Sequence, residues 1–179
     1  MRGRVNILDQ EVPVLQSLSA SVPENGLLVE IGAAWGFSAA RMAETCPDGA
    51  KIISIDPWTL APQKQQAERE KRYLETTAHV KDKVVPVKSF SQDFDLSILD
   101  KYGGEIDLLF IDGDHSFRGV KNDYEKFSPK IKNGGVIVFH DYNEKGAEWV
   151  TKFVDTVVVP SGFWWGWRVE YSLWIGTKT

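Results

Sequence analysis

Acidic and imidazole side chains gather directly after two short apolar runs of the sequence, and their types suit catalysis or metal binding. They are Asp112, Asp114, His115, His140 and Asp141. The first three follow the run 106–111, and the other two follow the run 136–139. If these runs are adjacent parallel strands, about 4.8 Å apart, their ends bring the side chains into one small volume. Converging carboxylates repel and are costly to desolvate, and a divalent cation relieves both penalties.

A second group of residues surrounds a glycine-containing turn. The apolar run 27–31 contains Glu30, turns through Gly32 and Gly36, and leads into a predicted helix over 37–45. A strand, a tight turn and a helix in this order are typical of the start of a nucleotide-binding βαβ unit. Glycine permits such a turn and lets a ligand touch the backbone.

Strands and helices are predicted to alternate along most of the chain and to position these residues. The predicted strands are 27–31, 51–55, 83–87, 106–111 and 136–139. The predicted helices are 37–45, 63–78, 93–101, 117–130 and 143–153, after a loosely helical segment at 6–19. Short, almost wholly apolar strands are typical of a parallel sheet buried on both faces. The alternation predicts an α/β, doubly wound fold with helices on both faces and ligands at the carboxyl ends of the strands.

The C-terminal part breaks this alternation. Two further strands are predicted at 155–159 and 168–175, and the loop between them has no room for a crossover helix. A parallel return needs about a dozen residues, so one of these strands must be antiparallel. A mostly parallel sheet closed by one reversed strand is similar to the seven-stranded, Rossmann-like sheet of class I S-adenosylmethionine (SAM) methyltransferases.

Four motifs carry this resemblance, and together they extend over about residues 27–142. They are the glycine turn at 29–38, the segment 54–58 with Asp56, the segment 89–93, and the pair 111–116 and 134–142. The first resembles small SAM-dependent O-methyltransferases, and the third resembles the adenine-side segment of catechol O-methyltransferase-like enzymes. The last pair closely resembles a subgroup with macrocin- and cephamycin-type O-methyltransferases.

The resemblance implies a SAM site built from all four motifs. The glycine turn would lie against the methionine half of SAM, and Asp56 would accept hydrogen bonds from both ribose hydroxyls. The implied SAM-binding residues are Glu30, Gly32, Gly36, Ser38, Asp56, Trp58, Ser91, Gln92 and Asp112.

The resemblance also implies a metal site. Asp112, His140 and Asp141 correspond to the metal ligands of the subgroup, although His140 stands where the pattern often has an acid. Oxygen ligands suit Mg²⁺, whereas imidazole suits Mn²⁺, Fe²⁺ or Zn²⁺ better, so the choice of metal stays open. The ion would lower the pKa of a substrate hydroxyl, and Asp114 or His115 would take its proton. His115 is better matched to neutral pH.

Two other functions are weighed against methyl transfer. An NAD(P)-dependent reductase would use a G-x-G-x-x-G turn, but Ala34 and Phe37 stand at the second and third glycine positions counted from Gly32. The Tyr-x-x-x-Lys pair of short-chain dehydrogenases is also missing. A non-catalytic SAM-binding module would keep the turn and Asp56 without the reaction.

Composition and charge limit the kinds of partner that we expect for this chain. The 179 residues predict a single domain over 1–179, with 25 acidic against 21 basic residues and no basic tract for a nucleic-acid backbone. The single cysteine fits a reducing, cytoplasmic setting, and no apolar stretch is long enough to cross a bilayer. We therefore expect a small-molecule hydroxylated acceptor, no nucleic-acid partner and no membrane partner, and the sequence leaves a homo-oligomer open.

Two segments have competing interpretations. The charged segment 59–80 is either a solvated surface helix or a lid over the cofactor. The aromatic cluster 163–167 is predicted to lie in a loop after a strand, where it would line the acceptor pocket, plug the core or form a dimer contact.

Overall fold

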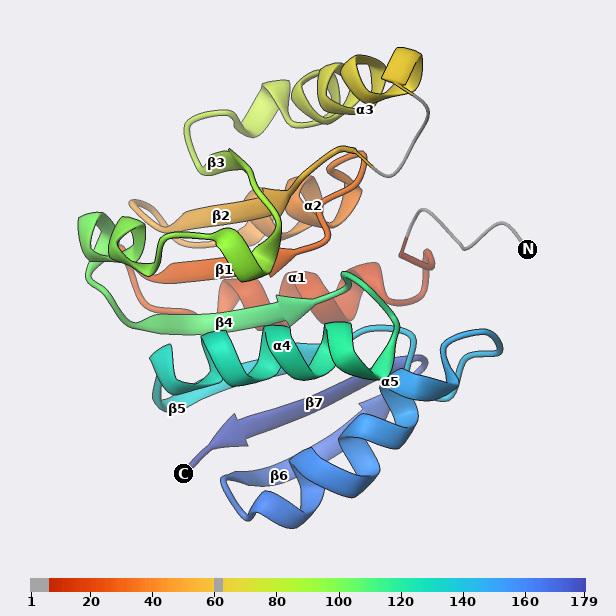
Figure 1. Cartoon of the computed structure of the whole chain (residues 1–179). Coiled ribbons are helices and arrows are strands. Elements are labelled where there is room, and N and C mark those ends of the chain that lie inside the picture. Colours follow the sequence, from red (N-terminus) through yellow and green to blue (C-terminus); the bar gives the residue numbers. More distant parts are fainter. Residues whose placement is uncertain (1–6, 60–62) are drawn as a thin grey trace.

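The computed structural model describes residues 7–59 and 63–179, with the backbone alone over 63–67. Its centre is a seven-stranded sheet in the order β3-β2-β1-β4-β5-β7-β6 (Figure 1). The strands are β1 Leu27–Ile31, β2 Lys51–Asp56, β3 Val84–Lys88, β4 Ile106–Ile111, β5 Ile131–Phe139, β6 Trp164–Glu170 and β7 Leu173–Lys178. Strands β1 to β5 pair parallel, and β7 pairs antiparallel with both β5 and β6. The predicted doubly wound sheet with one reversed strand is confirmed.

Helices cover both faces of this sheet (Figure 1). The α-helices are α1 Val12–Ala20, α2 Phe37–Thr45, α3 Gln63–Thr76, α4 Phe117–Phe127 and α5 Glu148–Phe153. Shorter helical segments are η1 Ala78–Val80, η2 Ser91–Asp93, η3 Leu96–Tyr102, η4 Ser128–Lys130, η5 Val154–Val158 and η6 Val159–Ser161. Buried residues of α1, α2 and α3 pack on one face, and those of α4 and α5 pack on the other.

The central strand β1 explains this three-layer arrangement. Leu27, Val29 and Ile31 belong to the apolar cluster beneath α4 and α5, whereas Leu28 belongs to the cluster beneath α1 and α2. Successive strand residues point to opposite faces, so an apolar run without polar alternation must be covered on both sides. Glu30 follows the same alternation, and its carboxylate is therefore buried in the α1 and α2 layer.

The predicted strand at 155–159 is wrong, because the segment Val154–Val158 continues helically from α5 as a π-helical turn. Its valines favour a strand by local propensity. However, Val150, Val154 and Val158 recur every four residues and are all buried against the sheet. The helical period of the apolar residues, which buries one face, overrides the propensity of the individual residues.

The aromatic cluster does not lie in a loop, which corrects the second C-terminal prediction. Four of its five residues lie in β6, where Trp164 and Trp165 pair with β7, and the hairpin to β7 turns at Tyr171 and Ser172 instead. Since β6 runs in the direction of the central strands, its first residue, Trp164, lies at the amino-terminal edge, opposite the carboxyl ends. Trp164 is buried and donates to the Tyr124 hydroxyl at 3.0 Å, whereas Trp165 is 60% exposed. An acceptor pocket lined by this cluster is therefore not supported.

The predicted strand at 168–175 is also wrong, because the turn at Tyr171 and Ser172 divides it between β6 and β7. The remaining differences concern element ends. The segment predicted as a helix at 93–101 forms the short turns η2 and η3, and β5 starts five residues before its predicted strand. The helix predicted at 143–153 begins only at Glu148, after a loop. Over the described ranges, no helix has the length and apolar character needed to cross a bilayer.

Candidate functional site

The carboxyl ends of the central strands lie side by side at one edge of the sheet, which we call the rim. Backbone hydrogen bonds join the residue that follows each of three strands to the end of the neighbouring strand. Gly32 N donates to Ile55 O at 2.9 Å, and Asp112 N donates to Ile31 O at 2.9 Å. His140 N donates to the last residue of β4 at 3.0 Å. These bonds extend the parallel pairing past the strand ends. The first residues of the three loops therefore lie side by side.

Three side chains at the rim form a cluster with metal-ligand chemistry. Ligand atoms of Asp112, His115 and Asp141 all lie within 4.8 Å of one another. His115 Nε2 lies 3.3 Å from Asp112 Oδ1 and 3.3 Å from Asp141 Oδ2. Two carboxylates and one imidazole suit Mn²⁺, Fe²⁺ or Zn²⁺, and Mg²⁺ with added water ligands. The residues present therefore fit a divalent cation.

His140, which the sequence pattern proposed as a ligand, is held differently. Its Nδ1 lies 3.1 Å from Asp112 Oδ1 and its Nε2 lies 3.1 Å from Glu11 Oε2, so both ring nitrogens face carboxylates. Burial alone would lower the pKa of His140, but the charge of Asp112 and the carboxylate hydrogen bonds raise it to about 12. The group of side chains whose ligand atoms converge contains His115 and not His140, and this grouping favours His115 as the imidazole ligand.

Glu11 is the residue at this site that the sequence analysis missed. It lies just before α1, is fully buried, and accepts a hydrogen bond from Leu8 N at 2.8 Å. Its other oxygen accepts from the Ser172 hydroxyl. Burial would raise its pKa, but the hydrogen bonds from His140, Ser172 and Leu8 lower it to about 2. Nothing in its local sequence marks it, since its partner His140 is 129 positions away.

The two candidate bases, Asp114 and His115, have different surroundings. Asp114 is exposed, and its oxygens accept from Ser116 N and from the Ser116 hydroxyl, each at 2.9 Å. It thereby shapes the turn that leads into α4. The hydrogen bond to Asp112 raises the pKa of His115, although burial opposes the shift. His115 thus points toward the rim cluster, while Asp114 has a role in the turn.

The glycine turn is a close backbone approach between β1 and β4. Gly32 has a φ of +92°, and a Cβ there would lie 2.0 Å from the Asp112 carbonyl oxygen. Gly36 has a φ of +80°, and a Cβ there would lie 2.9 Å from Tyr73 Cδ2. Both positions need glycine for conformation and for space. The turn is consequently pressed against the start of the loop that carries the rim cluster.

Glu30 and Ser38, both predicted to bind SAM, lie beneath this turn. The Ser38 hydroxyl donates to Glu30 Oε1, and the Ser54 hydroxyl donates to Glu30 Oε2 at 2.8 Å. Burial raises the pKa of Glu30 to about 7, although the two serine hydrogen bonds oppose the shift. The carboxylate therefore links β1, β2 and α2 from inside the α1 and α2 layer.

Asp56 stands at the end of β2, where the sequence places the ribose-binding acid. Its Oδ2 accepts from Ala34 N at 2.9 Å and its Oδ1 accepts from Trp58 N at 2.6 Å. Each carboxylate oxygen retains a further lone pair, so the side chain is oriented and still able to accept ribose hydroxyls. Trp58 is buried and donates from its indole nitrogen to the Ala34 carbonyl at 2.7 Å, which supports the turn from below.

Ser91 and Gln92, predicted on the adenine side, form η2 and are held against α4. The Ser91 hydroxyl donates to Asp123 Oδ1, and Lys126 Nζ donates to the Gln92 carbonyl at 2.7 Å. Asp123 is another residue that the sequence analysis missed, and burial raises its pKa to about 6. The segment is anchored by its backbone and by one hydroxyl.

Helix α3 combines features of both interpretations of the segment 59–80. Tyr73 and Thr77 are buried against the glycine turn, and the Tyr73 ring lies 5.2 Å from the Trp58 ring, centroid to centroid. The guanidinium of Arg72 lies 4.0 Å from the centre of the Trp35 ring. Arg72 itself and its neighbour Lys71 are exposed. The helix has a solvated face and a second face packed over the turn.

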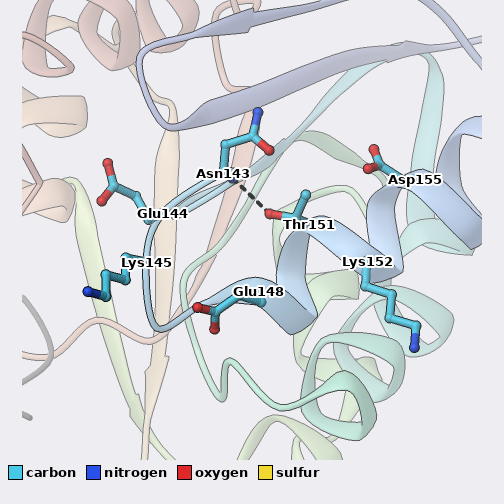
Figure 2. Close-up of a pocket in the computed structure, with 7 residues that line it drawn as sticks. All are labelled: Asn143, Glu144, Lys145, Glu148, Thr151, Lys152 and Asp155. Atoms are coloured by element: carbon cyan, nitrogen blue, oxygen red, sulfur yellow. Dashed lines mark hydrogen bonds between the residues drawn. The ribbon is translucent and has the colours of Figure 1, made fainter.

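A cavity of about 410 Å³ lies in the loop that leaves the rim cluster toward α5 (Figure 2). It is lined by Asn143, Glu144, Lys145, Glu148, Thr151, Lys152 and Asp155. Asn143 N donates to the Thr151 hydroxyl oxygen at 2.8 Å across its base. Asp141 and Asn143 have φ values of +58° and +63°, a left-handed backbone that non-glycine residues adopt rarely. Such strain is concentrated at functional loops.

Comparison with protein families identifies the chain. A family model described as a methyltransferase domain matches residues 29–142. The chain belongs to this methyltransferase family. The match runs from the glycine turn to the end of the β5 motif, so it includes the rim cluster. Family membership also argues against the reductase interpretation.

Two uncharacterised proteins are similar to part of the chain. An uncharacterised protein of Acanthamoeba polyphaga mimivirus is 33% identical over 133 residues, which are 73% of this chain and 58% of that protein. One of Sinorhizobium fredii is 27% identical over 117 residues, 64% of this chain and 13% of that protein. The chain thus spans only part of the length of these relatives.

Among solved structures, an O-methyltransferase from Bacillus cereus in complex with SAH has a TM-score of 0.71 at 17% identity, over 98% of this chain and 84% of that one. TomG, an O-methyltransferase from Streptomyces achromogenes in complex with SAM, has a TM-score of 0.71 at 16% identity, over 98% and 82%. CalS11, a TDP-rhamnose 3'-O-methyltransferase, has a TM-score of 0.67 at 15% identity, over 93% of this chain and 76% of that one. At these identities the likeness establishes the shared fold.

Proposed function

We propose that this protein transfers a methyl group from SAM to a hydroxyl oxygen of a small metabolite, with a divalent cation at the rim. The observation that carries the proposal is the contact between two sites. The glycine turn, which lies within the range that the family model matches, is pressed against Asp112, which itself belongs to the cluster of metal-ligand side chains. A donor at the turn and an acceptor at the cluster would therefore be neighbours.

The SAM side of the proposal rests on a preformed cradle. Asp56 is oriented by two backbone N–H groups, and Gly32 and Gly36 present bare backbone at both ends of the turn. When bound, SAM supplies an electrophilic methyl group on its sulfonium. Asp56 would accept the ribose hydroxyls, and the η2 segment with Ser91 and Gln92 would lie along the adenine. Glu30 and Ser38 would act beneath the turn as support.

On the acceptor side, Asp112, His115 and Asp141 would hold the cation. A bound cation lowers the pKa of a coordinated hydroxyl and orients it for in-line attack. The chain's own contribution is to fix the two carboxylates and to keep the site partly shielded from water. Alternatively, the two carboxylates would hold the cation, and His115, whose side chain is about one-third exposed, would take the proton of the acceptor.

The acceptor itself is proposed to be small and polar. The cavity in the loop that follows Asp141 in the sequence is lined by carboxylates, lysines, an amide and a hydroxyl rather than by aromatic rings. This lining suits a hydroxylated compound with its own polar groups better than a flat hydrocarbon. CalS11, which shares the fold, is described as acting on a nucleotide-linked sugar. A sugar-like acceptor fits the lining of this cavity.

Labelled SAM tests this function. Purified protein is incubated with methyl-labelled SAM and a panel of hydroxylated sugars, catechols and nucleotide sugars, with Mg²⁺, with Mn²⁺ or with EDTA. We expect transfer to at least one acceptor, and loss of transfer in EDTA and in the Asp141→Asn variant. Transfer that is unchanged in EDTA would overturn the metal role. SAM binding without transfer to the panel or to small-molecule extracts would favour a non-catalytic SAM-binding module.

A further inference from the structure

Glu11 connects the segment before α1 to the rim. It is one of few carboxylates in the described part of the chain that are completely buried. It accepts hydrogen bonds from Leu8 N at 2.8 Å, from Ser172 N at 3.3 Å and from the Ser172 hydroxyl. The remaining partner is His140 Nε2 at 3.1 Å. One side chain thus joins three segments that are far apart in the sequence.

We propose that Glu11 is a positioning residue for the metal site: it fixes the His140 ring so that Nδ1 is directed at Asp112 and Asp141. The inference rests on the proposed function for the identity of the bound ion. His140 Nδ1 lies 3.1 Å from Asp112 Oδ1 and 3.5 Å from Asp141 Oδ2. The ring therefore holds together the two carboxylates that face His115 on their other side.

The orientation of the His140 ring depends on Glu11. A half-turn about the bond between Cβ and Cγ would replace Nδ1 with a carbon and remove the donor from Asp112. The Phe110 ring, 5.9 Å away between centroids, packs against the imidazole at 65° and gives it no hydrogen bond. In the described structure, Glu11 is the hydrogen-bond partner of Nε2. This hydrogen bond is made in only one of the two ring orientations.

Burial strengthens this dependence on Glu11. The His140 side chain is only 4% exposed, so protein contacts hold its ring. The fully buried Glu11 carboxylate contacts Nε2, whereas Asp112 and Asp141 face Nδ1. Groups that hold and orient metal ligands in this way typically change metal affinity by about 10–100-fold when they are removed.

Two variants separate a purely stabilising role of Glu11 from its proposed role in positioning His140. Ser172→Ala is the matched control, because it removes a hydrogen bond from the same carboxylate without touching His140. Glu11→Gln keeps the size of the side chain but removes its charge and turns one acceptor into a donor. Both variants would lose stability, but only Glu11→Gln should disturb the rim.

The experiment measures Mn²⁺ binding by electron paramagnetic resonance, SAH binding by calorimetry, and the His140 ring N–H protons by NMR. For Glu11→Gln we expect Mn²⁺ affinity to fall about 10–100-fold, the Nε2–H signal to be lost or shifted, and SAH affinity to stay within about two-fold. For Ser172→Ala we expect both Mn²⁺ affinity and the Nε2–H signal to be unchanged.

Wild-type Mn²⁺ affinity in Glu11→Gln would overturn the inference, and so would an equal loss in Ser172→Ala. Failure of the proposed function has a different signature, because wild-type protein would then bind neither Mn²⁺ nor SAH. In that case the inference is decided by the NMR signal: an unchanged Nε2–H in Glu11→Gln removes the link between Glu11 and the ring.

Discussion

Two regions of the sheet are rich in residues that suggest function, and they lie at opposite ends of the strands. At the rim, Asp112 and Asp141 converge from neighbouring strand ends. In the edge strand β6, Trp165 and Trp167 are exposed, and Trp164 lies in the core. Both regions stand out in the sequence, but only the rim combines several elements in one place. The direction of a strand, rather than its composition, decides which of its ends can join a shared site.

The two regions also differ in energetic terms. Buried charges at the rim depend on one another, as Glu11, His140 and Asp112 show by their mutual contacts. Removing one partner leaves an uncompensated charge in a site with little water. Exposed aromatic side chains in β6 carry no such dependence. Substitutions should therefore have large effects at the rim and small effects at the exposed aromatic positions of β6.

The largest effect is expected for Asp141→Asn, which removes a ligand charge from the rim cluster. We expect methyl transfer to fall by about 10³-fold, within the range for loss of a group that acts on the proton or the metal. Trp167→Ser in β6 should stay within about two-fold of wild type. Initial rates with saturating SAM measure both variants. Equal losses in the two would erase the distinction between the regions.

A second substitution tests how closely the glycine turn packs on the rim. Gly32→Ala places a Cβ 2.0 Å from the Asp112 carbonyl and should lower the free energy of unfolding by about 3–4 kcal/mol. Gly103 is the control, since its φ is +98° but a Cβ there has no neighbour within 4 Å. Gly103→Ala should cost only about 1 kcal/mol. Urea unfolding separates them, and similar losses would show that the close approach is absent.

The third prediction concerns pH. Burial raises the pKa of Glu30 from 4.5 to about 7, so the folded state binds more protons than the unfolded state between these values. Stability should therefore fall as pH rises through this window, by up to about 3 kcal/mol. Glu30→Gln should make this part of the profile less steep, leaving the slope that Asp123 produces up to about pH 6 and the slope that His140 and His115 produce above about pH 6.5. An unchanged slope above pH 6 would contradict the burial of Glu30 as an acid.

The smallest effect on stability is expected for substitution of Trp167, an exposed aromatic residue of β6. Trp167 is 48% exposed and stacks on Trp174, so Trp167→Ser should lower the free energy of unfolding by less than about 1 kcal/mol. Trp164→Ser, at a buried position that also donates to Tyr124, should cost about 3–5 kcal/mol. Thermal unfolding of both variants provides the measurement. A large cost at Trp167 would indicate that this face is covered in solution.

The sequence predicted most where local pattern and environment agree. The strands 27–31 and 106–111 have their predicted bounds, because both runs are apolar on both faces and end in polar turns. The strand predicted at 155–159 was wrong because the valines there favour a strand by residue type, whereas the spacing of the apolar residues favours a helix. That conflict is visible in the sequence and could have been resolved by the period of Val150, Val154 and Val158.

The site was predicted in its composition but not in its detailed contacts. Asp112 and Asp141 lie together as the parallel topology requires. How the two imidazoles lie around them depends on side-chain direction and on a distant partner: His140 Nε2 contacts Glu11, and no local pattern connects these two residues. Asp123 and Ser91 form a similar pair from separate elements. Contacts of this kind come from tertiary packing, and a single sequence carries no signal for them.

The most direct test of the account is calorimetric titration of the folded protein with SAH, in wild type and in Asp56→Ala. The account predicts saturable binding at one site, weakened at least about ten-fold when the oriented Asp56 carboxylate is removed, which corresponds to about 1.4 kcal/mol or more. Wild-type protein that is folded and yet gives no binding heat with SAH or SAM over a range of temperatures would contradict it.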